Sequence, residues 1–388
     1  MQWDSSLNFW IGLAHTYGIK AVRKMDLLIE LVHKQGLSLD RAVESAYSGK
    51  ENYFLATEKE KEMLGRMIAD AAMNDVIVRN LQEKGIRLLT VMDPAYPAIV
   101  KKLQKKTAPL LLYVHGDPAL LNKPTTGIEG IRDTSPLSLR FTDTVARAAM
   151  ARGDVIVGGL INPVEKKALD YALYGGGSAV LLLAEGINRF KLPEYDRFVA
   201  EGRLAIVSFM HPDAERNLRT TMDRNMLFYD FCTHAFIAQS SAIGGGWDGA
   251  VNSLSKRPVY VRVEAGGEEN FNNLLISNGG IAVDENGIPG DFEALRVHMA
   301  TLPDNPVIPF RIDSPVTAAE YAGFLRKRLE KMQTLSLSDF FKENTLSDRI
   351  RFQLENIFNL SPDLEKIRVG NKVVYTIKGA IPRQGSLF

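Results

Sequence analysis

Residues 125–186, TTGIEGIRDTSPLSLRFTDTVARAAMARGDVIVGGLINPVEKKALDYALYGGGSAVLLLAEG, contain three short segments typical of buried strands, separated by two longer stretches with helical spacing. We expect strands at 128–131, 155–157 and 179–183. Strands that alternate with helices form parallel βαβ units. This stretch therefore predicts a βαβαβ unit at the core of a doubly wound α/β sheet.

Both predicted helices of this unit begin with a capping signal. Ser135-Pro136 and Asn162-Pro163 each place a capping side chain before a proline, which is favoured at the first helical position. Such helix starts lie at the carboxyl ends of parallel strands, where unpaired amides and the helix dipole favour anions. Arg132 lies in the loop before the first helix. We therefore predict a phosphate-binding ledge formed by this loop and the two helix starts.

Glycines extend the predicted ledge. Gly158-Gly159 follow the second strand, and a loop at 240–250 lies between a further apolar run and a helical stretch. Its residues Gly245 and Gly246 would let the backbone approach a ligand closely. The G-x-G-x-x-G spacing of a dinucleotide site and the lysine of a P-loop are absent, so no cofactor is predicted. A purely structural role for this loop remains the alternative.

The composition is that of a globular protein with two or three domains. The chain has 388 residues, of which 45% are hydrophobic and 24% charged, with a net charge of +1. Residues 311–388 contain 13 Lys and Arg against 9 Asp and Glu, a net charge of +4, which leaves −3 for the rest. The basic part of the chain is therefore its C-terminal part.

A single cysteine, Cys232, excludes an internal disulfide framework. Its apolar surroundings in the sequence predict a buried thiol instead of a nucleophile. The N-terminus has no basic segment followed by an apolar one, and no apolar run approaches the ~20 residues that cross a bilayer. These features predict a cytoplasmic protein that is neither exported nor membrane-spanning.

Residues 5–86 have apolar side chains at helical spacing and no clear strand pattern, so we predict a helical module at 1–88. The turn at 15–20, HTYGIK, is similar to a helix-hairpin-helix or SAM-type turn. In a helix-hairpin-helix two glycines expose amides to a phosphate, and here only Gly18 is present. A packing module is favoured, and a DNA contact is the alternative.

The C-terminal part has the element order of a winged helix. Helical spacing at 316–332 is followed by a short helix, a helix that ends at Phe358, and two apolar runs joined by Gly370-Asn371. Gly-Asn between apolar runs is a hairpin signal. We therefore predict a winged-helix domain at 311–380.

Arg349 and Arg351 lie near the start of the predicted recognition helix of this domain. Side chains at that position enter a DNA groove in winged helices, so both are predicted DNA contacts. A protein-interaction role is the alternative, because a small winged helix serves either use.

A series of short motifs runs through the middle of the chain. In order they are Leu112-Tyr113, Gly116-Asp117-Pro118, Gly130-Ile131-Arg132-Asp133 with Ser135, Gly158-Gly159-Leu160 with Ala168, Gly176-Gly177, Arg224-Asn225, and Asn273 with Gly279-Gly280-Ile281-Ala282-Val283. Their order and spacing resemble the DprA/Smf family over about 100–285.

This resemblance implies an extended Rossmann domain, placed here at 89–310, between the helical module and the winged helix. It also implies non-catalytic binding of single-stranded DNA in DNA processing and recombination, with a RecA-type recombinase and a second copy of the chain as partners. The predicted DNA- or phosphate-binding residues are Arg132, Ser135, Gly158, Gly159, Asn162, Lys166, Lys167, Arg224, Asn225, Gly245 and Gly246.

The chain departs from the family pattern at several positions. The glycine-isoleucine-aspartate that follows the glycine pair is Pro163-Val164-Glu165 here, the next histidine is Leu169, the arginine after Arg224-Asn225 is Met226, and the strand-end glutamate is Gln239. The alternative function is a SLOG-type protein of a bacterial defence system that senses a nucleotide or another phosphorylated ligand. Phosphoribohydrolase activity would need paired acids, and Asp248 is a single acid.

The last residues form a separate motif. Gln384, Leu387 and Phe388 resemble the short peptide that binds the bacterial sliding clamp, at the end of a predicted flexible tail at 381–388. Burial of the two apolar side chains in a groove would supply about 1.5–3 kcal/mol each. A tail without a partner is the alternative.

Overall fold

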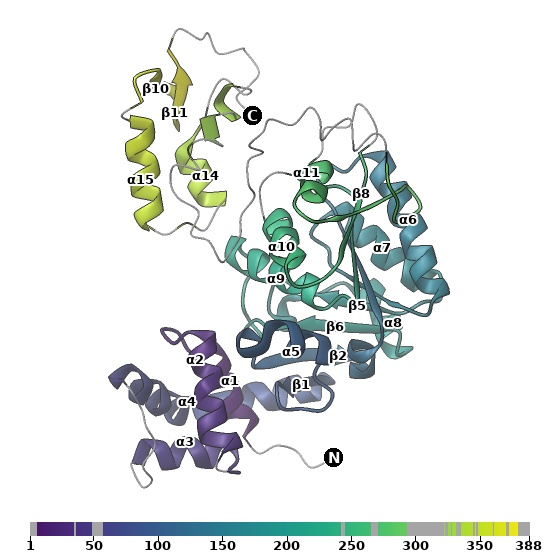
Figure 1. Cartoon of the computed structure of the whole chain (residues 1–388). Coiled ribbons are helices and arrows are strands. Elements are labelled where there is room, and N and C mark those ends of the chain that lie inside the picture. The colour runs from purple at the N-terminus through teal and green to yellow at the C-terminus, as the bar shows by residue number, and fades with distance from the viewer. Residues whose placement is uncertain are drawn as a thin grey trace.

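A computed structural model describes residues 6–34, 36–48, 57–241, 245–264 and 271–292. It also describes 322, 325, 326, 328–330, 335–343, 346, 348–359, 361–369 and 372–378. A nine-stranded mixed sheet with helices on both faces forms the centre (Figure 1), and this confirms the predicted α/β fold class.

The strand order in the sheet is β1-β2-β6-β5-β4-β3-β7-β8-β9. The strands are β1 (Ile86–Thr90), β2 (Leu111–Gly116), β3 (Thr125–Glu129), β4 (Val155–Gly158), β5 (Ala179–Leu182), β6 (Leu204–Ser208), β7 (His234–Ile237), β8 (Val259–Arg262) and β9 (Ile281–Val283). The seven strands β6-β5-β4-β3-β7-β8-β9 pair in parallel. At the β6 side, β2 pairs antiparallel with β6, and β1 pairs antiparallel with β2.

The order of the strands reverses beside β3. From β3 the chain proceeds outward through β4, β5 and β6, and it then returns to place β7 on the other side of β3. In a doubly wound sheet a ligand crevice forms at the carboxyl ends of the strands at such a switch point. The topology therefore marks the carboxyl ends of β3 and β7 as the place to look for a site.

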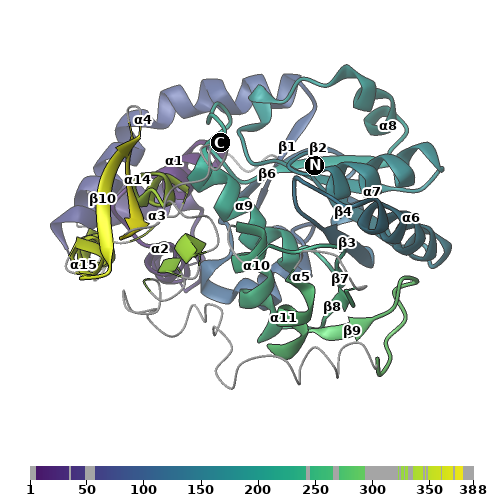
Figure 2. The ribbon, with the colours of Figure 1, turned by 90° about the horizontal axis from the view of Figure 1, so that it is seen from above.

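Helices cover both faces of the sheet (Figure 2). Helices α6 (Pro136–Ala151), α7 (Pro163–Tyr174) and α8 (Asp196–Ala200) lie on one face, and α9 (Leu218–Asp230), α10 (Gly245–Leu254) and α11 (Asn272–Ser277) lie on the other. Helix α5 (Ala98–Gln104) contacts α9. Short 3-10 turns occur at η2 (Lys105–Thr107), η3 (Pro118–Asn122), η4 (Ile187–Arg189) and η5 (Pro193–Tyr195).

The two predicted capping signals are confirmed. The Ser135 hydroxyl accepts a hydrogen bond from the Ser138 amide at 3.2 Å, and the Asn162 side chain accepts one from the Glu165 amide at 3.0 Å. Each cap precedes a proline at the first helical position. Helices α6 and α7 therefore begin where the sequence predicts, directly after β3 and β4.

The predicted position of the first strand was wrong by several residues. Strand β3 covers 125–129 instead of 128–131, because Thr125 and Thr126 are buried despite their polar side chains. Their hydroxyls donate to the Phe231 carbonyl at 2.7 Å and to Asp154 at 2.8 Å. Ile131 consequently lies in the loop beyond the strand.

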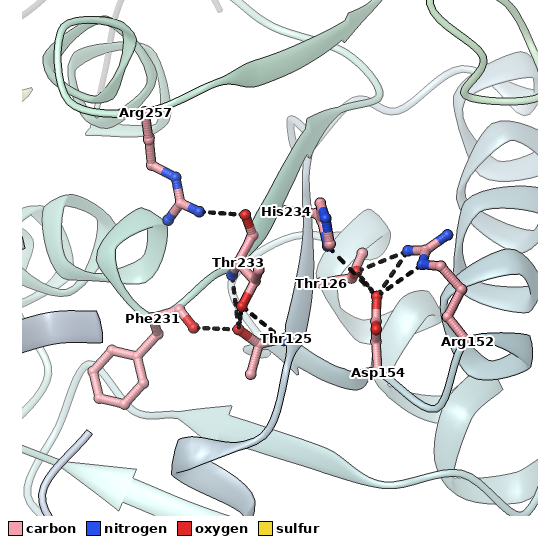
Figure 3. A network of polar contacts seen from close by, with 8 residues as sticks. All are labelled: Thr125, Thr126, Arg152, Asp154, Phe231, Thr233, His234 and Arg257. Carbon is pink, nitrogen blue, oxygen red and sulfur yellow. Dashed lines mark hydrogen bonds and ion pairs between the residues drawn. The ribbon is translucent and has the colours of Figure 1, made fainter. Parts of the chain in front are cut away.

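These threonines belong to a polar network at the amino ends of β3, β4 and β7 (Figure 3). Thr125 and Thr233 exchange amide-to-hydroxyl hydrogen bonds of 3.1 and 2.8 Å. Asp154 also accepts from Arg152 at 2.8 Å and lies 3.6 Å from His234. The network fixes the relative position of the three central strands at their amino ends.

The N-terminal helices are α1 (Leu7–His15), α2 (Ala21–Leu28), α3 (Leu39–Ser48) and α4 (Glu58–Glu83), with a π turn, η1 (Ile29–His33), after α2. Helix α1 packs along α4, and the apolar side chains of both join one continuous cluster with those of the sheet. The predicted helical character of this part is confirmed. Its apolar core is continuous with that of the sheet.

His15, at the end of α1, connects the N-terminal helices to the sheet. Its Nε2 lies 2.9 Å from the Tyr113 hydroxyl of β2, and its ring packs edge-on against His211 with centroids 5.3 Å apart. Burial, His211 and Lys24 lower the pKa of His15 from 6.5 to about 3. The neutral imidazole therefore stabilises this contact.

The described C-terminal residues form a second apolar cluster. Its elements are α14 (Leu337–Glu343), α15 (Asp348–Asn359) and the antiparallel hairpin of β10 (Leu364–Val369) and β11 (Lys372–Ile377), and a β-bridge joins Leu335 to Tyr375. This is the order predicted for a winged helix. Gly370 and Asn371 lie outside the described residues, and the predicted domain boundaries stay predictions.

Cys232 is buried, and burial raises the pKa of its thiol to about 12. Its sulfur packs so closely on Gly127 of β3 that a side chain there would collide with it, as an ideal Cβ would lie 2.3 Å away. This thiol is a packing group. Among the described helices, none is long and apolar enough to cross a membrane.

The His15 contact predicts a pH-dependent stability. The unfolded chain protonates this histidine near pH 6.5, whereas the folded chain resists protonation until about pH 3. The unfolded state therefore binds more protons between these values, and the stability that is present above pH 6.5 is lost as the pH falls. Thermal unfolding of His15→Gln should show a flatter fall in melting temperature over this range than wild type, by a few degrees. The same substitution at exposed His33 is the control, and identical profiles for wild type and His15→Gln would contradict the prediction.

Candidate functional site

A cavity of about 240 Å³ lies at the switch point. We call it the switch-point cavity. Its walls come from the carboxyl ends of β3 and β7, the loop after each strand, and the faces of α9 and α10. Apolar side chains such as Ile131, Ile237 and Trp247 line it, together with polar groups that include Glu129 and Ser240. The cavity thus lies at the place that the strand order marks for a site.

Arg132 stands at the rim of this cavity and is exposed. It makes no ion pair or hydrogen bond with any group in the part of the chain that the structure describes. The amides of Arg132, Asp133 and Thr134 also donate no hydrogen bond to the described residues. A guanidinium and several amides are therefore available to an anion at this place.

The loop that carries Arg132 is held in place by the next strand. The Ser135 amide donates to the Gln239 side-chain oxygen at 2.8 Å, and Gln239 follows β7. The predicted first half of the ledge, Arg132 with the start of α6 at Ser135, therefore borders the switch-point cavity.

Arg224 does not lie on the surface, contrary to its predicted role as a phosphate contact. It is fully buried and forms an ion pair with the fully buried Glu165 of α7. Its Nε donates to the Leu182 carbonyl of β5 at 3.1 Å, and its Nη1 donates to the Asn225 oxygen at 3.2 Å. A cation this deep is retained because a carboxylate and a carbonyl satisfy it. Arg224 is a structural residue here.

The predicted glycine pair is explained by the same ion pair. An ideal Cβ at Gly159 would lie 2.2 Å from the Arg224 Nη2 and 2.5 Å from the Glu165 Oε2. At Gly158 the Cβ would lie 3.1 Å from the Glu165 carbonyl. Both glycines are buried, so they make room for α7 and the ion pair instead of presenting amides to solvent.

Asn162 closes the start of α7. Its Nδ2 donates to Glu129 and to Glu165, each at 2.9 Å, while its Oδ1 accepts from the Glu165 amide. The residue is 7% exposed and lines the switch-point cavity. The second half of the predicted ledge is thus a buried wall of the cavity.

Glu129, the last residue of β3, is 4% exposed. Burial and the neighbouring Glu165 carboxylate raise the pKa of Glu129 well above 4.5, against the opposing effects of Arg224, the Gly130 amide and Asn162. Burial at this position therefore favours the protonated form of the Glu129 carboxyl. Its Oε2 has no hydrogen-bond partner among the described residues.

Of the other predicted contacts, Asn225 and Gly246 line the switch-point cavity, and Gly245 begins α10. Lys166 and Lys167 do not line it. They line a separate open groove of about 520 Å³ along α6 and α7, where Lys166 pairs with Asp170 and Lys167 with Asp143. The structure therefore separates the two lysines from the ledge.

The predicted winged-helix contacts lie on α15. The Arg351 guanidinium packs over the Phe341 ring at 5.9 Å, and the residue is half-buried. The side chain of Arg349 and the tail with Gln384, Leu387 and Phe388 lie outside the described residues. These predictions are not tested by the geometry.

Glu129 and Tyr229 were missed by the sequence analysis, although both line the cavity. A signal for Glu129 was present, because an acid inside a predicted buried strand is unusual. No comparable signal marked Tyr229, which lies on α9 among aromatic residues that form the core.

Across the described residues, no cluster of three or more His, Cys, Asp or Glu side chains could hold a metal ion. The switch-point cavity is lined by one carboxyl group and by no histidine, cysteine or lysine in that part of the chain. The ionisable acid and base that line it are therefore the Glu129 carboxyl and, at the rim, the Arg132 guanidinium.

The family model described as DNA recombination-mediator protein A matches residues 87–283, about half of the chain. This range contains the whole nine-stranded sheet except the first residue of β1. The chain belongs to this family. The resemblance stated from the motifs is therefore confirmed. No curated protein matches the chain.

Two solved structures are similar to the chain. DNA processing protein A from Streptococcus pneumoniae has 16% identity and a TM-score of 0.57, and the match covers 73% of this chain and 95% of that one. DNA processing protein A from Helicobacter pylori, whose structure was described for its single-stranded DNA binding mode, has 22% identity and a TM-score of 0.43, and the match covers 55% of this chain and 96% of that one. The first of these likenesses supports the fold.

The buried ion pair predicts a large stability effect for Arg224. Replacement by Met should reduce the free energy of unfolding by about 3–5 kcal/mol, because it leaves the Glu165 charge buried without a partner. The double variant Arg224→Met with Glu165→Leu should recover at least half of this loss. Urea denaturation of the full chain measures both. A loss below about 1 kcal/mol in the single variant would show that Arg224 is not structural.

Proposed function

We propose that this chain is a non-catalytic, single-stranded-DNA-binding protein of DNA processing and recombination. Family membership supports a function on DNA, and the observation that carries the site is the unpaired Arg132 at the rim of the switch-point cavity. An exposed guanidinium with no acidic partner among the described residues is suited to a phosphate.

The single-stranded DNA would contact the ledge through its sugar-phosphate backbone. A phosphate beside Arg132 can accept hydrogen bonds from the guanidinium and from the amides of the same loop, which carry no other partner in the described chain. The start of α6 adds a favourable dipole on the same side. Such contacts position a strand without reading its sequence.

The polar groups of the cavity favour binding over hydrolysis. Acid-base catalysis by two carboxyl groups would need a second titratable acid in the cavity, and Glu165 is occupied by Arg224. Asp248, the acid next to the glycine loop, does not line the cavity. We therefore assign no catalytic residue.

The proposal also includes a second DNA contact and protein partners. The C-terminal unit, with Arg349 and Arg351 on α15, would add a second DNA contact or a protein contact. The chain would form a homodimer. Its other protein partners would be a RecA-type recombinase and a sliding clamp, the latter bound through Gln384, Leu387 and Phe388. Loss of clamp binding on deletion of 384–388 is the result expected for the last of these.

Arg132 gives the sharpest test of the DNA proposal. Arg132→Ala should weaken binding of oligo(dT) and reduce the slope of log affinity against log salt by about 0.7, the value of one single-strand phosphate contact. The melting temperature should change little, because this side chain has no partner in the described structure. Fluorescence anisotropy at several salt concentrations measures affinity and slope together.

The matched control is Arg87→Ala. Arg87 is exposed on β1, and four strands separate β1 from β3 in the sheet. This variant should retain the affinity and slope of wild type. An Arg132→Ala protein that does the same would remove the ledge from the account of DNA binding.

A further inference from the structure

Lysines on helix α5 and on the turn η2 that follows it divide into two that anchor the fold and two that are free. The Lys101 ammonium donates to a carbonyl of the loop after β1 at 2.9 Å, and the Lys106 ammonium pairs with Asp26 of α2 at 2.7 Å. Lys102 and Lys105 are exposed, and their side chains have no hydrogen bond or ion pair with any group in the described part of the chain. Two ammonium groups are therefore available at this place.

A third free lysine joins them from the other side of the end of α9. The Gln104 side chain of α5 donates to the fully buried Asp230 carboxylate, which ends α9. Burial raises the pKa of Asp230, and the charge of the neighbouring Lys256 opposes this shift. Lys256 is exposed and its side chain has no partner among the described residues. We call Lys102, Lys105 and Lys256 the lysine cluster.

Lys105 has a backbone conformation that is costly for a residue with a side chain. Its φ is +51° and its ψ is −119°, and across the described residues no other non-glycine residue has a positive φ. Glycine adopts such angles without steric cost, whereas other residues are strained there. Residues that remain in strained conformations gather at functional sites. A lysine at this position therefore indicates a use for its side chain.

The lysine cluster and the ledge lie at opposite ends of the parallel strands. Asp230 and Lys256 come shortly before β7 and β8, so the cluster lies at the amino ends of these strands, and α5 contacts α9 there (Figure 1). Helix α9 connects the two places, because Thr221 and Met222 near its start line the switch-point cavity. The 13 residues of α9 span about 20 Å.

A nucleic acid backbone fits this surface better than a protein does. The exposed large apolar side chains of the described chain all lie outside α5, η2 and the ends of α9 and α10. Protein interfaces have an apolar core, whereas a lysine binds a phosphate as a point charge and needs none. Asp230 is bonded to Gln104 and Asp26 to Lys106, so neither carboxylate is bonded to the cluster.

We propose that the lysine cluster is a second nucleic-acid contact, which binds the phosphates of a strand that extends from the ledge along α9. This inference rests on the proposed function, because the strand at the ledge is its starting point. Crossing about 20 Å takes about six nucleotides at about 3.4 Å each. Only an oligonucleotide longer than this reaches both surfaces.

Oligo(dT) of two lengths separates the two surfaces. The double variant Lys102→Gln with Lys105→Gln should bind a strand of about 30 nucleotides about tenfold more weakly than wild type at physiological salt, with a salt slope reduced by about 1.4, the value of two single-strand phosphate contacts. Its affinity for a strand of about six nucleotides should equal that of wild type, because the ledge is intact. Fluorescence anisotropy of the full chain measures affinity and slope.

The matched control is the double variant Lys34→Gln with Lys59→Gln. Both residues are exposed in the N-terminal helical part, and the net charge changes by the same amount. This control should keep the wild-type affinity for both lengths, so it distinguishes local contacts from a general effect of charge.

Lys105→Gly tests the strained backbone together with the charge. It should bind the long strand as weakly as Lys105→Gln, but it should melt about 1–3 °C higher than Lys105→Gln because glycine relieves the strain. A melting temperature below that of Lys105→Gln would overturn the assignment of Lys105.

The outcomes separate this inference from the proposed function. If Arg132→Ala weakens binding while the Lys102/Lys105 variant binds the long strand like wild type, the second contact is overturned and the proposed function stands. Equal losses at both lengths would overturn the path along α9. Unchanged DNA affinity with lost binding of polyglutamate would assign the cluster to an acidic protein instead. A wild-type chain that binds neither length would contradict the proposed function and this inference together.

Discussion

Arg224 and Glu165 form a fully buried ion pair. This ion pair connects the elements that meet at the carboxyl ends of the central strands. Two desolvated charges are stable only when each is fully satisfied, which forces a particular arrangement of the elements that supply the partners. Helix α9 brings Arg224, α7 brings Glu165, and β5 contributes the Leu182 carbonyl. Gly159 must lack a side chain for these atoms to meet.

The same ion pair sets the properties of the cavity beside it. Asn162 bridges Glu165 to Glu129, and the Glu165 carboxylate contributes to the raised pKa of Glu129. The two ends of the central parallel strands thus differ in their polar contacts. At the amino edge the hydroxyls of Thr125 and Thr126 have partners, whereas at the carboxyl edge Glu129 has an oxygen with none in the described structure. The polar groups at the amino ends hold the strands together, whereas the carboxyl ends carry the proposed binding site.

Much of the fold could be predicted from local signals. The caps at Ser135 and Asn162 fixed the helix starts, and apolar runs located β4 and β5, because local hydrogen bonds and side-chain periodicity decide both. The burial of Arg224 could not be predicted in this way. Whether an arginine is exposed or buried depends on a carboxylate that lies 59 residues earlier in the chain.

The most direct test of the ledge and cavity is hydrogen–deuterium exchange of the full chain with and without a saturating single-stranded oligonucleotide. Amides that lie under a bound strand exchange more slowly. The account predicts protection of 130–139 and of 237–250, with no change in β1 and the N-terminal helices. Protection confined to α15 and the β10–β11 hairpin, with the loop around Arg132 unchanged, would contradict it.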